Sequence, residues 1–286
     1  MMVATGTYTG DGIDDRAITG VGFRPDVVII KGDTNGRSAV ARSASMTGDQ
    51  TKPLASGLSL VMNRIQSLDL DGFTIGTHAA VNTSGVTYRW IAFKAAAGEL
   101  KVDSYIGNGT SQSITGMGFS PEFVVMLGSN ANNAIHRSST MTSPYRFDYT
   151  AAGADSLNSL DADGFSVGSH AQVNASGITY HYLAWNDVPG RVRVTSYTGD
   201  GLDDRSITGV GFLPEYVIIK ADATGAACHR GVHRPSSIST DSTLNFTTGV
   251  NFANGIQALE TDGFQLGMDC TVNTSGATYH YIAFND

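Results

Sequence analysis

The sequence contains few of the residues that several functional classes require. Only two of its 286 residues are cysteine, so the disulfide framework of a small secreted domain is excluded. Charged residues make up 15%, no block of Lys or Arg occurs, and the net charge is −8. A nucleic-acid-binding protein needs a cationic surface to neutralise phosphates, so we expect no nucleic-acid partner.

Long hydrophobic segments are also missing. No apolar run approaches the ~18 residues of a membrane-spanning helix, and residues 27–30 are typical of the runs present. The first ten residues lack the basic region and apolar core of a signal peptide. We therefore expect a soluble chain made in the cytoplasm, with no membrane insertion.

Strong helix formers are scarce, because Glu occurs four times and Lys five times. Glycine, in contrast, accounts for 34 residues, about 12% against a usual ~7%. Thr, Ser, Val, Ile and Tyr are abundant. This composition predicts an all-β protein with many turns.

The chain consists of three copies of one unit. Residues 7–31 and 196–220 are identical at 19 of 25 positions, and residues 104–127 repeat the same motif one residue shorter. The second half of the unit, from DGF to VNxSGxTY, also occurs three times. We predict repeats at 1–97, 98–189 and 190–286, since Gly98 and Pro189-Gly190 mark the breaks.

Each repeat is expected to hold six or seven short strands. Residues 86–94 are apolar on both alternating faces, as in a strand that lies between two layers. A short helix is an open alternative for residues 54–67. Short strands with Gly-rich turns predict β-sandwich or jelly-roll-like units, and the short linkers favour a compact pseudo-threefold arrangement.

The aromatic residue after the Gly-x-Gly turn is predicted to lie in the core. It precedes the most apolar strand in every repeat, and burial of the three rings is expected. Their exposure in a groove would instead indicate a carbohydrate-binding platform. The three residues are Phe23, Phe119 and Phe212.

Two groups of residues are candidate metal ligands. The acidic loops at 11–15 and 200–204 have enough carboxylates for Ca²⁺, but the middle repeat has none at 108–112, which favours a plain turn. The third repeat also combines two cysteines with nearby histidines and an aspartate. Its spacing matches no compact zinc motif, and alignment of Cys228 with Val40 and Ile135 favours a buried thiol, so no metal or cofactor is predicted. The residues of this zinc alternative are Cys228, His229, His233, Asp269 and Cys270.

No set of Ser, His and Asp is kept across the repeats, and the sequence holds no nucleophile elbow or phosphate-binding loop. We therefore expect a protein that is not an enzyme.

An arginine aligned in all three repeats is the best candidate for partner contact. It follows a position that holds Ala41 in the first repeat and His in the other two. Two interpretations are open: the arginine pairs with a turn carboxylate such as Asp71 or Asp163, or it faces a partner or glycan. The candidate contact residues are Arg42, Arg137, Arg230, His136 and His229.

Several spaced motifs together resemble a bacteriophage domain. GFRPDV at 22–27, DGF at 71–73 and NTSGVTYRWIAFK at 82–94 occur in order, and their counterparts recur across nearly the whole chain. This string is similar to a domain of tail-associated and fibre-like phage proteins, where it occurs as a single copy attached to a longer protein.

The resemblance implies a non-enzymatic virion structural protein, a tail or fibre/spike component that takes part in host-surface attachment. Its partners would be other virion proteins and a host-surface glycan, and its location the virion, assembled in the host cytoplasm. A capsid-surface decoration protein, a lectin with three sites and a glycan-degrading enzyme are the alternatives. The variable segments 44–66, 139–156 and 232–256 are where recognition would differ between repeats.

Overall fold

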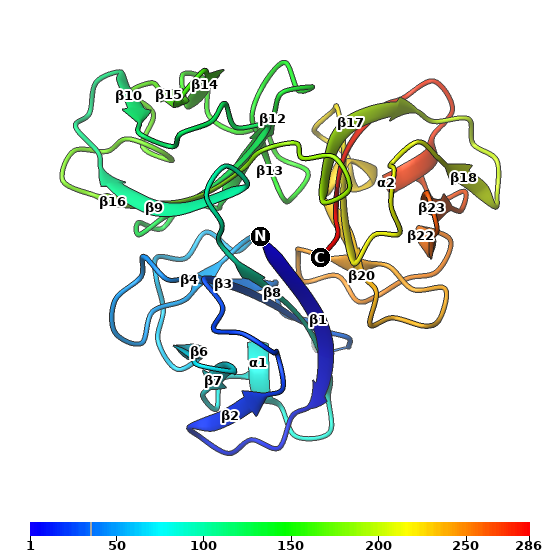
Figure 1. The fold of residues 1–286 in the computed structure, drawn as a ribbon, viewed down its shortest axis with the longest axis horizontal. Coiled ribbons are helices and arrows are strands. Elements are labelled where there is room, and N and C mark those ends of the chain that lie inside the picture. The colour runs from blue at the N-terminus through cyan, green and yellow to red at the C-terminus, as the bar shows by residue number, and fades with distance from the viewer. Residues whose placement is uncertain (35) are drawn as a thin grey trace.

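The computed structural model describes residues 1–34 and 36–286 and shows three units with one strand pattern (Figure 1). Unit 1 holds β1 Met2–Thr9, β2 Arg16–Thr19, β3 Val27–Gly32, β4 Val40–Ser43, β5 Lys52–Pro53, β6 Ile65–Asp69, β7 Gly72–Ile75, α1 Ala79–Asn82 and β8 Thr87–Lys94. Unit 2 holds β9 Leu100–Ile106, β10 Gln112–Thr115, β11 Phe123–Gly128, β12 Ile135–Ser138, β13 Tyr145–Arg146, β14 Leu157–Asp161, β15 Gly164–Val167 and β16 Thr179–Trp185. Unit 3 holds β17 Val192–Thr198, β18 Arg205–Ile207, β19 Tyr216–Ala221, η1 Ala227–His229, β20 Val232–Pro235, β21 Leu244–Asn245, β22 Ile256–Glu260, β23 Gly263–Leu266, α2 Cys270–Asn273 and β24 Thr278–Phe284.

Each unit is a sandwich of a five-stranded and a three-stranded antiparallel sheet. The large sheets are ordered β1-β8-β3-β4-β5, β9-β16-β11-β12-β13 and β17-β24-β19-β20-β21. The small sheets are ordered β2-β7-β6, β10-β15-β14 and β18-β23-β22. The prediction of three β-sandwich units with equivalent strand order is therefore confirmed.

The last strand of each unit lies inside its large sheet and has two buried faces. In β8, Tyr88, Trp90 and Ala92 pack against Phe73 of the small sheet, inside unit 1. The alternate residues, Ile91 and Phe93, face the other two units. Because the strand lies between two apolar layers, both of its alternating residue sets are hydrophobic, as its sequence pattern predicts.

The three large sheets share one central core. Its middle is a triangle of equivalent rings, Phe93, Trp185 and Phe284, whose centroids lie 5.1 to 5.5 Å apart. The space left at this centre is about 10 Å³ and is lined by apolar and aromatic side chains. A site of this size and polarity stays dry. The three units therefore form one compact pseudo-threefold body.

Backbone hydrogen bonds close the ring of units. Each unit presents a carbonyl from the segment after its fifth strand to an N–H just before the fourth strand of a neighbouring unit. The three bonds run from Ala134 N to Leu54 O (3.2 Å), Gly231 N to Phe147 O (2.9 Å) and Ala39 N to Phe246 O (2.9 Å). This is the closed head-to-tail contact of a cyclic trimer, made here within one chain. Both termini lie near the centre of the body (Figure 1).

Two details of the predicted repeat are corrected or confirmed by the fold. Residues 54–67 form no helix; a turn region leads into β6 instead. The predicted burial of Phe23, Phe119 and Phe212 is confirmed, since their exposed fractions are 8%, 9% and 7%.

A tight turn anchors each small sheet and depends on glycine. Asp163 accepts hydrogen bonds from the N–H groups of Gly116 and Gly118, which lowers the pKa of its carboxyl group. The next residue, Gly164, has φ of +152°, and a Cβ there would lie 1.9 Å from the backbone oxygen of Ile114.

We expect Gly164→Ala to lower the free energy of unfolding by at least about 2 kcal/mol, because it adds both an unfavourable φ and a backbone overlap. The control is Gly177→Ala, at φ of +76° with open space around it. It should cost only about 1 kcal/mol, the cost of the left-handed conformation. Urea denaturation measures both; equal losses would contradict the overlap.

Candidate functional site

The strand arginine occupies an equivalent position in all three units, but in unit 3 it is Arg234. The strand registers place Arg42 opposite Val28, Arg137 opposite Val124 and Arg234 opposite Val217. The alignment of Arg230 with this set is wrong. His-Arg occurs at both 229–230 and 233–234, and the longer loop before β20 places only the second pair on the strand.

These arginines bind the variable segments to the large sheets. Their guanidinium groups donate to backbone carbonyls of residues that follow in the same unit, and burial lowers the pKa of each side chain, that of Arg234 to about 10. All three remain protonated at neutral pH. The acceptors are Gly48, Gln50 and Ile65 for Arg42, Thr142, Leu157 and Asn158 for Arg137, and Ile238, Ser242 and Ile256 for Arg234.

The turn carboxylates predicted to pair with the strand arginines have other partners. Asp71 and Asp163 accept hydrogen bonds from glycine N–H groups of their turns. Pairing of Arg42 or Arg137 with these two aspartates is therefore wrong. The intramolecular role exists, with carbonyl oxygens in place of carboxylates.

The strand histidines lie in the central core. His136 stacks on Phe147 with centroids 4.5 Å apart, and His233 stacks on Phe246 at 4.1 Å. Both rings are buried, which lowers the pKa of each well below the usual value. Among the described residues, neither ring nitrogen of His136 has a hydrogen-bond partner.

The five candidate contact residues therefore differ in accessibility. Arg42 and His136 are buried and present no side chain to the surface. Arg137, Arg230 and His229 are half-buried. His229 Nδ1 lies 2.9 Å from the carbonyl oxygen of Thr224, and Arg230 lies over the ring of Phe252. Contact with a partner or glycan stays a prediction for these three.

A polar side-chain contact joins the units at each junction, and one of these contacts has the residue types of a catalytic triad. Between units 2 and 3, Thr140 Oγ1 is 2.8 Å from Nδ1 of His280, whose Nε2 is 3.4 Å from Asp222. The equivalent tie between units 1 and 2 is Ser45 to His181, at 2.9 Å. Between units 3 and 1, Arg89 donates to the carbonyl of Ser237 and pairs with Asp33.

These three contacts occupy equivalent positions in the units, but their residue types differ. Only one of them combines a hydroxyl, an imidazole and a carboxylate. His280 is 3% exposed and burial lowers its pKa, so its ring is neutral and largely closed to substrate. The common role of the three ties is to hold neighbouring units together.

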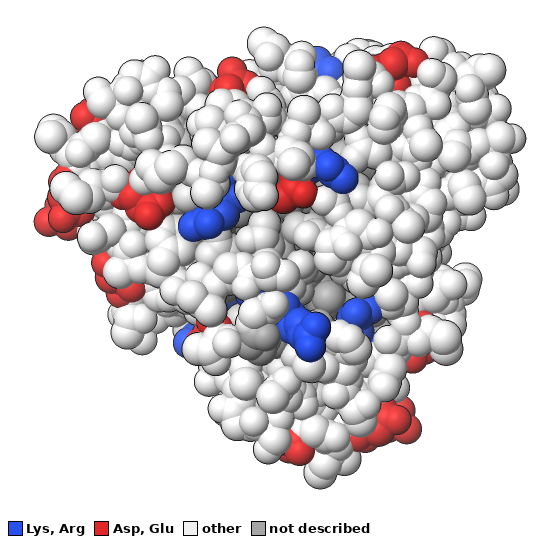
Figure 2. Space-filling model, turned by 180° about the vertical axis from the view of Figure 1, so that it is seen from behind, with Lys and Arg blue, Asp and Glu red and all other residues white. Residues whose placement is uncertain are grey.

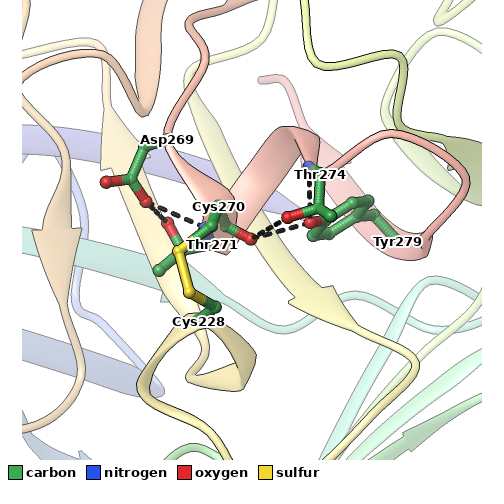
Figure 3. The surroundings of a disulfide bond; sticks show 6 residues. All are labelled: Cys228, Asp269, Cys270, Thr271, Thr274 and Tyr279. Atoms are coloured by element: carbon green, nitrogen blue, oxygen red, sulfur yellow. Dashed lines mark hydrogen bonds between the residues drawn. A yellow bond between two sulfur atoms is a disulfide. The ribbon is translucent and has the colours of Figure 1, made fainter.

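Cys228 and Cys270 form a disulfide (Figure 3). The bond joins η1 to the first residue of α2, where Asp269 caps the helix by accepting from Thr271 N. Figure 3 also shows Tyr279 donating to the carbonyl of Cys270. The expected buried thiol is wrong, because β20 places Val232 at the position of Val40 and Ile135. A disulfide also removes both cysteines as zinc ligands.

Reduction of this disulfide should destabilise the protein by about 2–4 kcal/mol, because the bond closes a loop between residues 42 apart in sequence. A shift of the thermal midpoint on adding a thiol reductant measures the effect. The Cys228→Ser, Cys270→Ser double variant is the control and should not respond to reductant. An unchanged midpoint in the wild-type protein would contradict the prediction.

The acidic loops are turns that do not require charge. In each loop, the first side chain accepts a hydrogen bond from the N–H two residues later. The backbone N–H of that first residue donates to a fully buried asparagine, which is Asn82, Asn174 or Asn273. Unit 2 makes the same turn with Asn108, which has no charge. Among the described residues, no cluster of three His, Cys, Asp or Glu is placed to hold a metal ion. The turn pairs are Asp11–Ile13, Asn108–Thr110 and Asp200–Leu202.

Three surface hollows lie beside the variable segments. The largest, about 510 Å³, is bounded by Arg137, Tyr145 and Asp155 of unit 2 and by Thr224 of unit 3. A hollow of about 360 Å³ lies beside Arg234 in unit 3, and one of about 250 Å³ lies in unit 1. On the face opposite to Figure 1, the visible Lys and Arg gather around the middle, whereas most Asp and Glu lie farther out (Figure 2).

The fold and these sites define an all-β protein of three units, with surface hollows beside its variable loops. The family described as "Domain of unknown function (DUF7483)" matches residues 2–103, 100–188 and 172–286, and the chain belongs to this family. No curated protein and no solved structure matches the chain. In the described part of the chain, none of the helices has the length and apolar character to span a membrane.

Proposed function

We propose that the chain is a non-enzymatic structural protein of a bacteriophage virion, a tail or fibre/spike component that contacts the host surface. The observation that carries the proposal is the closed ring of three homologous units around one core. Such a body has the approximate symmetry of a trimer, so a single chain fits a position built for threefold contacts. The resemblance of its motifs to tail-associated phage domains supports the same assignment.

The placement of polar groups supports a structural role. The strand arginines bind loop carbonyls, the acidic side chains shape turns, and the hydroxyl–histidine pairs tie units together. Each of these groups has a structural partner in the fold. The surface left for recognition is the variable segments and their hollows, which suit other virion proteins or a host-surface glycan.

Cryo-electron microscopy of particles of the phage that encodes the chain tests the proposal, combined with a labelled antibody against the purified protein. We expect one compact density of three lobes at the tail or its fibres. Density on the capsid surface would instead support a decoration protein. Absence from particles together with saturable binding on a glycan array would support a free lectin, and both results would overturn the proposal.

A further inference from the structure

A basic cluster occupies the hollow of unit 1. Arg64 directly precedes β6, is only 7% exposed, and lies against the ring of His78. Its Nε is 3.3 Å from Nδ1 and its Nη2 is 3.2 Å from Nε2 of that ring. Arg37 lines the same hollow, and Thr248 closes it from unit 3.

This cluster contains more hydrogen-bond donors than acceptors. His78 Nδ1 also faces the N–H of Ala80 at 3.0 Å, so three N–H groups meet the two nitrogens of one ring. A neutral imidazole has a single acceptor nitrogen, and a protonated one has none. Among the described residues, the buried Nη1 of Arg64 also has no hydrogen-bond partner. None of the described residues supplies the missing acceptor, so a group from solution can take that place.

Arg64 contributes a buried positive charge to this cluster. In the part of the chain that the structure describes, no carboxylate forms an ion pair with Arg64. Burial and the neighbouring Arg37 lower the pKa of Arg64, and burial, Arg64 and Arg37 lower that of His78. A bound anion would relieve this repulsion.

The fold does not require the cluster. The residue before the sixth strand of the unit is Arg64 in unit 1, but Ser156 and Gly255 in the other two units. His78 caps the following helix. Unit 2 keeps a histidine with the same contact, His170, whereas Asp269 serves this purpose in unit 3. Because serine and glycine satisfy the fold in the other units, Arg64 is available for another role, and Asp269 shows that the helix cap does not require a histidine.

We propose that this hollow binds a small ligand bearing an oxyanion group, with that group on Arg64 and His78. A planar guanidinium suits carboxylate or phosphate oxygens, which accept two parallel hydrogen bonds. The volume of about 250 Å³ and the apolar wall of Pro53 and Leu58 leave room for a compact carbon skeleton beside the charged group. A sugar acid or a sugar phosphate fits this description. The proposal does not depend on a virion location.

Isothermal titration calorimetry at pH 7 and constant ionic strength tests the site, with inorganic phosphate, glucuronate and uncharged glucose as probes. We expect saturable binding of phosphate or glucuronate and none of glucose. Tighter binding of glucuronate would assign the site to a sugar acid, and tighter binding of phosphate to a phosphorylated ligand. Absence of saturable binding for both anions, or equal binding of glucose, would overturn the proposal.

Two variants identify the residues. Arg64→Ser copies unit 2, and His78→Asp copies the cap of unit 3 while placing a carboxylate beside Arg64. Both should bind the anion at least tenfold more weakly, and Arg24→Ser, at an exposed arginine outside the hollow, should bind normally. Circular dichroism checks folding, and His78→Asp keeps the test valid if Arg64→Ser does not fold. Undiminished binding by a folded Arg64→Ser or His78→Asp variant would overturn the assignment.

Discussion

Lowering the pH from 7 to 5 is expected to reduce the free energy of unfolding by at least about 4 kcal/mol. The cause is the pair of imidazoles in the central core, His136 and His233, which stack on phenylalanine rings away from water. Burial dominates the lowering of both pKa values. Nearby positive charge adds to it, from Lys220 near His136 and from Lys31 near His233.

The sign follows from proton binding. In the unfolded chain each histidine has a pKa near ~6.5, so below that pH the unfolded state binds protons that the folded core rejects. The contribution of each neutral histidine to stability is therefore present above pH ~6.5. Below that pH the free energy of unfolding falls by about 1.4 kcal/mol per pH unit for each histidine. His181 adds to the loss, because burial lowers its pKa to about 4.

Urea denaturation across pH 7 to 5 measures this dependence. The double variant His136→Leu, His233→Leu should lose most of the slope, since it removes both titrating rings. Unit 1 provides the matched position: Ala41→His adds a third ring and should steepen the slope by about 1.4 kcal/mol per pH unit. A slope that the double variant leaves unchanged would contradict the assignment.

Truncating one ring of the central triangle should lower the free energy of unfolding by about as much as the change of pH. We expect Trp185→Ala to lower the free energy of unfolding by about 3–5 kcal/mol, because the ring is 2% exposed and contacts Phe93, Phe123 and Phe284. Trp185→Phe copies units 1 and 3 and should cost less than about 1.5 kcal/mol.

The control for this truncation is Leu70→Ala, at a side chain 86% exposed, which should change stability by no more than about 0.5 kcal/mol. Thermal and urea denaturation give the comparison. A loss for Trp185→Ala as small as that for Leu70→Ala would mean that the triangle does not support the body.

Repeated local patterns predict the unit well. The apolar residues on both faces of β8 predict a strand between two layers, and the structure places Tyr88 and Trp90 on one side and Ile91 and Phe93 on the other. The buried phenylalanine after the Gly-x-Gly turn is equally local. Both depend on side-chain periodicity within a few residues, and this information is present in a single chain.

Features that depend on loop length or on contacts between units were not predictable. The loop before β20 is longer than in the other units, so an alignment without a gap pairs Arg230, in place of Arg234, with Arg42. The same alignment wrongly places Cys228 on the strand. Some aromatic contacts of the central core also join different units: Phe147 of unit 2 packs against Phe246 of unit 3. Such contacts form only when the three units close into a ring. The pattern of a strand predicts which of its faces is apolar, but it does not predict which residues of another unit cover that face.

The hollow in unit 1 has a similar explanation. Arg64 and His78 are 14 residues apart in sequence, and neither belongs to a recognisable motif. A comparison of the repeats position by position would have singled out Arg64, since Ser156 and Gly255 stand where unit 1 has this buried arginine.

The central claim is that the three units form one body around a shared core, and differential scanning calorimetry of the intact chain tests it most directly. The account predicts a single transition whose calorimetric and van't Hoff enthalpies agree, with Trp185→Ala moving the whole transition to lower temperature. Three separable transitions, of which Trp185→Ala shifts only the one that belongs to unit 2, would contradict it.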